Sequence, residues 1–111
     1  MVAPRLNLYS QFSIIPVGNF TRNTSIATAT TITIPATATG IIIQADAADA
    51  TYTFDSADGS ATTATADVGF DLLDGEPPVR IDLYPGATLS VISATGEIKY
   101  QFFRVAGDEL A

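Results

Sequence analysis

The sequence predicts an all-β protein: an antiparallel β-sandwich of about eight strands with an extended N-terminal arm. Apolar residues alternate with polar ones in many short segments, and this period of two is typical of strands with one buried face. Turn residues interrupt these segments about every ten residues, as in antiparallel sandwiches and barrels. No segment of useful length shows the 3.6-residue period of a helix. A chain of 111 residues is long enough for one domain with a core and too short for two.

The first 23 residues differ from the rest of the chain. Apolar residues occupy both parities between residues 5 and 15, and prolines and a glycine interrupt the pattern. We interpret residues 1–23 as an arm with one irregular strand at about residues 5–15 and then a loop, followed by a sandwich domain at residues 24–111. The alternative is an edge strand of the same sandwich. An arm with apolar residues on both faces needs cover on both, so it would cross to a neighbouring subunit. The candidate assembly contacts are Leu6, Leu8, Phe12, Ile14, Arg5 and Arg22.

The first half of the domain contains three predicted strands and a long loop. Residues 24–35 alternate until Pro35 ends the strand, and residues 40–45 (GIIIQA) form a short, largely buried strand. A third strand covers residues 50–55. Residues 56–67 are small and polar, so we expect an exposed, mobile loop there.

The second half contains four predicted strands separated by strong turn signals. These strands cover residues 68–73, 79–84, 87–93 and 97–105. Phe103 and Val105 break the parity of the last strand, which predicts a bulge or a second buried face. The predicted core consists of Ile32, Ile34, Ile42, Phe54, Phe70, Leu72, Ile81, Leu83, Leu89, Val91, Tyr100 and Phe102.

Charge is distributed unevenly along the chain. The net charge is −7; residues 1–45 carry Arg5 and Arg22 and no acid, so all 12 acids follow, together with Arg80, Lys99 and Arg104. Five dispersed cations do not form a contiguous phosphate-binding patch, so the composition argues against nucleic-acid binding. A solvated acidic surface is the simplest interpretation. The alternative is that the basic-to-neutral first third docks on an acidic partner.

The residue types argue against catalysis. The chain has no His and no Cys, so the usual general base, zinc ligand and thiol nucleophile are missing. Acidic residues are close in sequence at Asp71, Asp74 and Glu76, but turns are rich in Asp for reasons of backbone geometry. The stretch from Asp55 to Ser60 weakly resembles the start of a calcium loop, yet Ala66 stands where the bidentate Glu should be. We therefore expect no enzyme activity, no cofactor and no metal.

No targeting or membrane segment is visible in the sequence. Residues 1–20 lack the basic start and apolar core of a signal peptide. The longest strongly apolar run, Ile41–Ile43, is far below the roughly 20 residues that span a bilayer. We expect no membrane partner.

Several strand and turn segments resemble, in their order along the chain, small virion structural proteins of tailed bacteriophages. They cover about residues 30–105 and are Ile34-Pro35-Ala36, Gly40–Ala45 (GIIIQA), Tyr52-Thr53-Phe54-Asp55, Gly69-Phe70-Asp71-Leu72, Pro85-Gly86-Ala87-Thr88-Leu89 and Tyr100-Gln101-Phe102-Phe103-Arg104. In these relatives a Gly often follows the Asp of the Tyr-Thr-x-Asp stretch, whereas this chain has Ser56.

The resemblance implies a compact, jelly-roll-like β-sandwich in the virion, assembled in the host cytoplasm. Its expected function is capsid decoration: a cement protein that bridges major capsid protein subunits and stabilises the head shell, as a homo-oligomer, by analogy a trimer. The alternatives are a neck, tail or fibre-base component, with other virion structural proteins as partners, and a carbohydrate-binding module. An enzyme ranks last.

Overall fold

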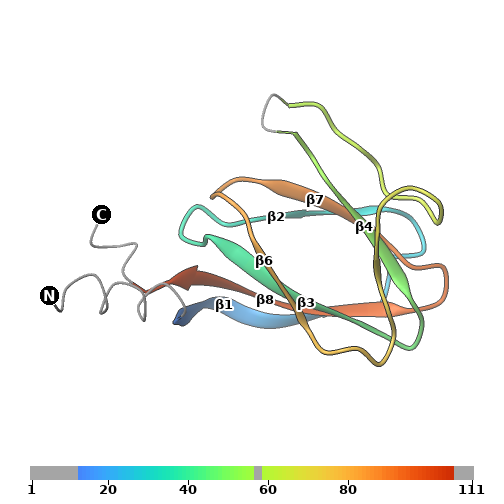
Figure 1. Cartoon of the computed structure of the whole chain (residues 1–111), viewed down its shortest axis with the longest axis horizontal. Coiled ribbons are helices and arrows are strands. Elements are labelled where there is room, and N and C mark those ends of the chain that lie inside the picture. The colour runs from blue at the N-terminus through green and yellow to red at the C-terminus, as the bar shows by residue number, and fades with distance from the viewer. Residues whose placement is uncertain (1–12, 57–58, 107–111) are drawn as a thin grey trace, which may run out of the picture.

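The computed structural model describes residues 13–56 and 59–106, and these residues form an all-β sandwich, as predicted (Figure 1). The described part contains no helix. Its eight strands are β1 (Ile14–Asn23), β2 (Thr30–Thr33), β3 (Gly40–Asp46), β4 (Ala50–Phe54), β5 (Phe70–Leu72), β6 (Val79–Asp82), β7 (Thr88–Ile92) and β8 (Glu97–Val105).

The strands form two four-stranded antiparallel sheets. Sheet A has the order β1-β8-β3-β6 and sheet B the order β2-β7-β4-β5. The first strand pairs with the last, the second with the seventh, the third with the sixth and the fourth with the fifth. This nesting is what results when one long hairpin rolls up into two sheets, and it is the jelly-roll arrangement.

The core lies between the inner faces of the two sheets. In sheet A, Ile41 pairs with Phe102 and Ile43 with Tyr100, so these side chains share one face. In sheet B, Leu89 and Val91 are fully buried at the centre of the facing surface. The core cluster is Ile26, Ile32, Ile34, Ala38, Ile41, Ile43, Ala45, Ala50, Leu72, Ile81, Ala87, Leu89, Val91 and Ile98.

A second buried position lies on the outer face of sheet A, at Phe103. Its partner in the β3–β8 ladder is Gly40, and a β-carbon there would lie 2.3 Å from Phe103 Cζ. The Arg80 guanidinium carbon lies 4.9 Å from the centroid of the Phe103 ring. Phe103 is fully buried because a neighbour without a side chain leaves room for the ring. Of the two predicted causes of the parity break, the structure shows the second buried face.

Residues 14–23 of the predicted arm belong to the sandwich, and the expectation of a loop after residue 15 was wrong. They form β1, which pairs antiparallel with β8 from Ile14↔Val105 to Asn23↔Ile98. The alternative considered above, an edge strand, describes this segment, and a boundary after residue 23 would separate β1 from its own sheet. The ladder shifts register between Val17 and Thr21, where Gly18 has φ +72°. The Gln101 side-chain amide donates to the carbonyls of Val17 and Gly18 and so holds this irregular segment.

Part of the loop between β4 and β5 is attached to sheet B. Ala64 is buried, and its backbone N–H donates to the Ser90 hydroxyl on β7 over 3.0 Å. The Thr53 hydroxyl donates to the carbonyl of Thr62. These hydrogen bonds join part of the loop to the outer face of sheet B. The other described residues of 56–67 are exposed, as predicted. Small residues allow the backbone to lie close to the sheet.

Two positions of the predicted core are wrong. Phe70 is 61% exposed because β5 is a three-residue edge strand with a neighbour on one side only. Ile42 is half-buried, because Ile41 and Ile43 take the inner face of β3 and Ile42 takes the outer one. Phe54, Leu83, Tyr100 and Phe102 are partly buried and pack against the core cluster.

Candidate assembly surfaces

The edge strand β1 carries two of the candidate assembly contacts, Ile14 and Arg22, and one exposed apolar residue that the prediction did not include. Ile14 is 37% exposed at the start of the strand. Phe20, in the irregular segment, is 62% exposed and was not predicted, because an aromatic residue between Asn19 and Thr21 gives no clear alternation. Of the other candidates, Arg5, Leu6, Leu8 and Phe12 lie outside the described residues.

Arg22, the remaining candidate, takes part in ion pairs within the chain. Its Nη2 atom lies 3.1 Å from Asp46 Oδ2 and 2.8 Å from Glu97 Oε1. Lys99 Nζ lies 3.6 Å from Asp46 Oδ2. The Lys99 charge, together with hydrogen bonds from the Ala47 backbone and neighbouring side chains, lowers the pKa of Asp46 below its ordinary value. Arg22 thus links β1 to β3 and β8, and it is not a free cation for a partner.

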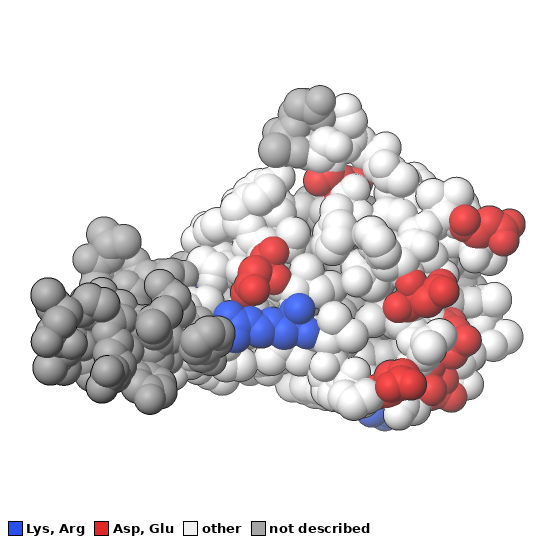
Figure 2. All heavy atoms as spheres, viewed as in Figure 1, with Lys and Arg blue, Asp and Glu red and all other residues white. Residues whose placement is uncertain are grey.

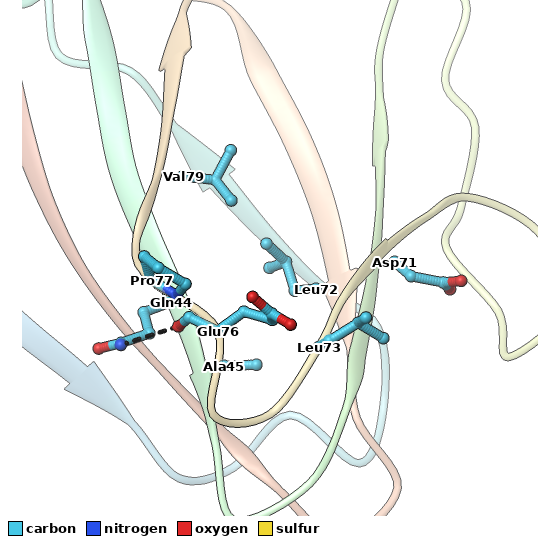
Figure 3. Close-up of a pocket in the computed structure, with 8 residues that line it drawn as sticks. All are labelled: Gln44, Ala45, Asp71, Leu72, Leu73, Glu76, Pro77 and Val79. Atoms are coloured by element: carbon cyan, nitrogen blue, oxygen red, sulfur yellow. Dashed lines mark hydrogen bonds between the residues drawn. The ribbon is translucent and has the colours of Figure 1, made fainter.

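A groove lies at the opposite, open edge of the sandwich, between β5 and β6. β5 pairs only with β4 and β6 only with β3, so neither sheet continues across this edge. The hollow has a volume of about 320 Å³ and is shown in Figure 3. Its lining residues, which we call the open-edge groove, are Gln44, Ala45, Asp71, Leu72, Leu73, Glu76, Pro77 and Val79.

Hydrogen bonds fix the loop that forms one wall of the open-edge groove. The Gln44 side-chain amide donates to the carbonyl of Glu76 over 3.1 Å, as the dashed line in Figure 3 shows. The Glu76 N–H donates to the carbonyl of Leu73, and the Asp74 N–H donates to Asp49 Oδ1 over 2.8 Å. The loop is thereby attached to β3 and to the β3–β4 turn, so the groove is built before any partner binds.

Apolar side chains of the open-edge groove are exposed to solvent. Leu73 is 48% exposed and Val79 is 38% exposed. Phe70, which precedes the lining residues on β5, stacks with Tyr52 and Phe54, with ring centroids 5.7 and 6.1 Å away. Burial raises the pKa of the Tyr52 phenol above its usual value, so this aromatic cluster is uncharged at neutral pH. Clustered exposed apolar side chains typically mark a site of interaction.

The surroundings of the open-edge groove are acidic. Asp71 and Glu76 line it and Asp74 lies in its loop, and no Lys or Arg in the described part of the chain forms an ion pair with them. In Figure 3, Glu76 extends toward Leu72 and Leu73, whereas Asp71 points away. Figure 2 shows several acidic side chains gathered on the right of the molecule in this view. A basic or neutral apolar segment would complement this surface.

Among the described residues, the acidic side chains do not form a metal centre. Within residues 13–56 and 59–106, no three His, Cys, Asp or Glu side chains are grouped so as to hold a metal ion. The Asp55 carboxylate, at the start of the weakly calcium-like stretch, instead accepts hydrogen bonds from the Thr62 N–H and the Thr88 hydroxyl. In the same part of the chain, no helix has the length and hydropathy of a membrane span.

Comparisons with protein-family models, curated proteins and solved structures found no match to this chain.

Proposed function

We propose that this chain is a structural protein of a tailed bacteriophage particle, a decoration protein that cements the head shell. The proposal combines the sequence resemblance with two properties of the fold, of which the first is its jelly-roll architecture. Jelly rolls are common among viral capsid proteins, but lectins and cupins share them, so the architecture alone does not select a function. The second property is the distribution of exposed apolar residues on the edges of the sheets.

The observation that carries the proposal is the exposed apolar surface of β1. Phe20 and Ile14 project from a ten-residue edge strand whose other side pairs with β8. Pro16 lacks an N–H and the ladder is irregular after Val17, and both features oppose continuous strand addition along this edge. The coat-protein contact is therefore made by apolar side chains, with Phe20 at its centre.

Apolar burial contributes more to this attachment than charge does. Arg22 is already paired within the chain, so its net gain from a new exposed ion pair would be below about 1 kcal/mol. Burying an exposed Phe or Ile side chain contributes about 1.5–3 kcal/mol. Because such burial is not screened by salt, attachment should survive high ionic strength.

Co-sedimentation with purified head shells tests the proposal. The full chain should pellet with shells and remain bound through washes of increasing NaCl concentration. Phe20→Glu should weaken binding at least tenfold. Tyr84→Glu is the matched control, because Tyr84 is also about half exposed but lies in the β6–β7 turn. Failure to pellet, release by moderate salt, or equal loss in both variants would contradict the proposal.

A further inference from the structure

The open-edge groove has the chemistry of a receptor for an extended apolar segment with a basic residue. Its walls present Leu72, Leu73 and Val79, and the Glu76 side chain extends toward the two leucines. Hydrogen bonds fix its loop. The volume of about 320 Å³ accommodates a few apolar side chains but not a folded element.

The chain contains one segment with the complementary chemistry, before β1. Leu6 and Leu8 share a parity, so in an extended conformation both project to the same side. Arg5 is the only charged side chain among residues 1–12. An extended segment with two leucines and one cation matches an apolar groove with an acidic rim.

Chain length separates the segment from the groove of its own molecule. Ile14 pairs with Val105, whereas Ala45 in the groove pairs with Ile98 at the other end of β8. The two ends of this strand are about 24 Å apart at about 3.4 Å per residue, and β1 and β6 are also opposite edges of sheet A. Leu8 is six residues before Ile14, and such a segment spans at most about 22 Å. Leu8 therefore cannot reach Ala45, at the far end of the groove of its own chain.

We propose that residues 5–8 of one copy bind the open-edge groove of a second copy, with Leu6 and Leu8 against Leu72, Leu73 and Val79 and with Arg5 beside Glu76. The contact joins two different surfaces, so it is heterologous, and repeating it with a rotation that closes produces a ring. This inference deepens the proposed function by naming the partner of one surface, and it leaves β1 free for the shell.

Disulfide trapping in solution tests the contact, because the chain has no native Cys. A Leu8→Cys chain is mixed with a Leu73→Cys chain under mild oxidation, and the mixed dimer is quantified by mass. This mixed dimer should form at least tenfold faster than the dimer of Leu8→Cys with Tyr84→Cys, an exposed control position in the β6–β7 turn. Val79→Cys provides a second groove position if Leu73→Cys does not fold.

Two further variants test the chemistry of the contact. Leu6→Glu, introduced into the Leu8→Cys chain, should slow cross-linking at least tenfold. Arg5→Glu should slow it several-fold, and Glu76→Arg in the other chain should restore the rate. Equal cross-linking rates at positions 73 and 84 would overturn the proposal, as would a rate that does not change with Leu6→Glu. An intramolecular disulfide in a monomer that carries both Leu8→Cys and Leu73→Cys would also overturn it. No shells are present, so a negative result here leaves shell attachment, measured by sedimentation, unaffected.

Discussion

Phe103 is fully buried although its side chain lies on the outer face of sheet A, and Phe70 is largely exposed although its side chain lies on the inner face of sheet B. The difference comes from the neighbours. Gly40 and Arg80 enclose the Phe103 ring, whereas the edge position of β5 leaves one side of Phe70 open. Alternation in the sequence identifies the face of a strand, but the depth of a side chain depends on what lies across from it.

These two residues predict a matched pair of mutational effects. Phe103→Ala should lower the free energy of unfolding by about 3–5 kcal/mol, because it removes a fully buried ring. Phe70→Ala should lower it by less than about 1 kcal/mol, since that ring is mostly in solvent. Urea denaturation of the two variants measures both values, and similar losses would show that the burial of one ring is wrong.

The ion pairs around Asp46 predict the acid dependence of stability. The pKa of Asp46 is lowered in the folded state, chiefly by Lys99, so the unfolded chain takes up this proton first as the pH falls. The stabilisation is complete above the ordinary pKa of 3.8 and is lost as the pH falls through the lower folded value.

Asp46→Asn should therefore reduce the loss of unfolding free energy between about pH 5 and pH 3, compared with the unmodified chain. Lys99→Met should reduce the same loss, because Lys99 is the largest cause of the lowered pKa. Denaturation midpoints measured at low ionic strength across this range provide the test. Unchanged slopes in both variants would mean that these ion pairs do not form in solution.

At the scale of elements, the positions of the strands after residue 24 were predictable, whereas that of the first strand and several strand lengths were not. The predicted strand at residues 97–105 matches β8, since clear alternation runs along its whole length. The predicted strand at residues 24–35 contains only β2, Thr30–Thr33, although Ile26 and Ile34 on either side are fully buried. Burial alone produces alternation, whereas a strand also needs a partner ladder, which local sequence does not reveal.

The β4–β5 loop shows the same limit and offers a local test. Ser90→Ala removes the hydroxyl that accepts a hydrogen bond from the buried N–H of Ala64. Leaving such an N–H unpaired lowers the free energy of unfolding by about 1–3 kcal/mol. The effect should be concentrated in this loop, with hydrogen exchange near residue 64 accelerated while the amides of β3 and β8 keep their protection. Uniform acceleration across both sheets would contradict the attachment of this loop as a separate local unit.

At the scale of the whole molecule, the sequence was sufficient for the class of fold but not for the surfaces. The alternating segments predict eight strands, but the nested pairing of β1 with β8 joins residues far apart in the chain, and no local signal specifies it. The open-edge groove was not predicted for the same reason. Gln44 and Ala45 come close to Val79 when β6 pairs with β3, and Leu73 joins them only after the two sheets pack together.

The most direct test of the proposed function is a cryo-electron microscopy reconstruction of tailed-phage particles incubated with this chain. We expect jelly-roll density on the outer surface of the head, bridging capsid protein subunits, with β1 toward the shell and β5 and β6 of each copy toward its neighbour. Density for this chain confined to the neck, tail or fibre base, or particles without this chain, would contradict the account.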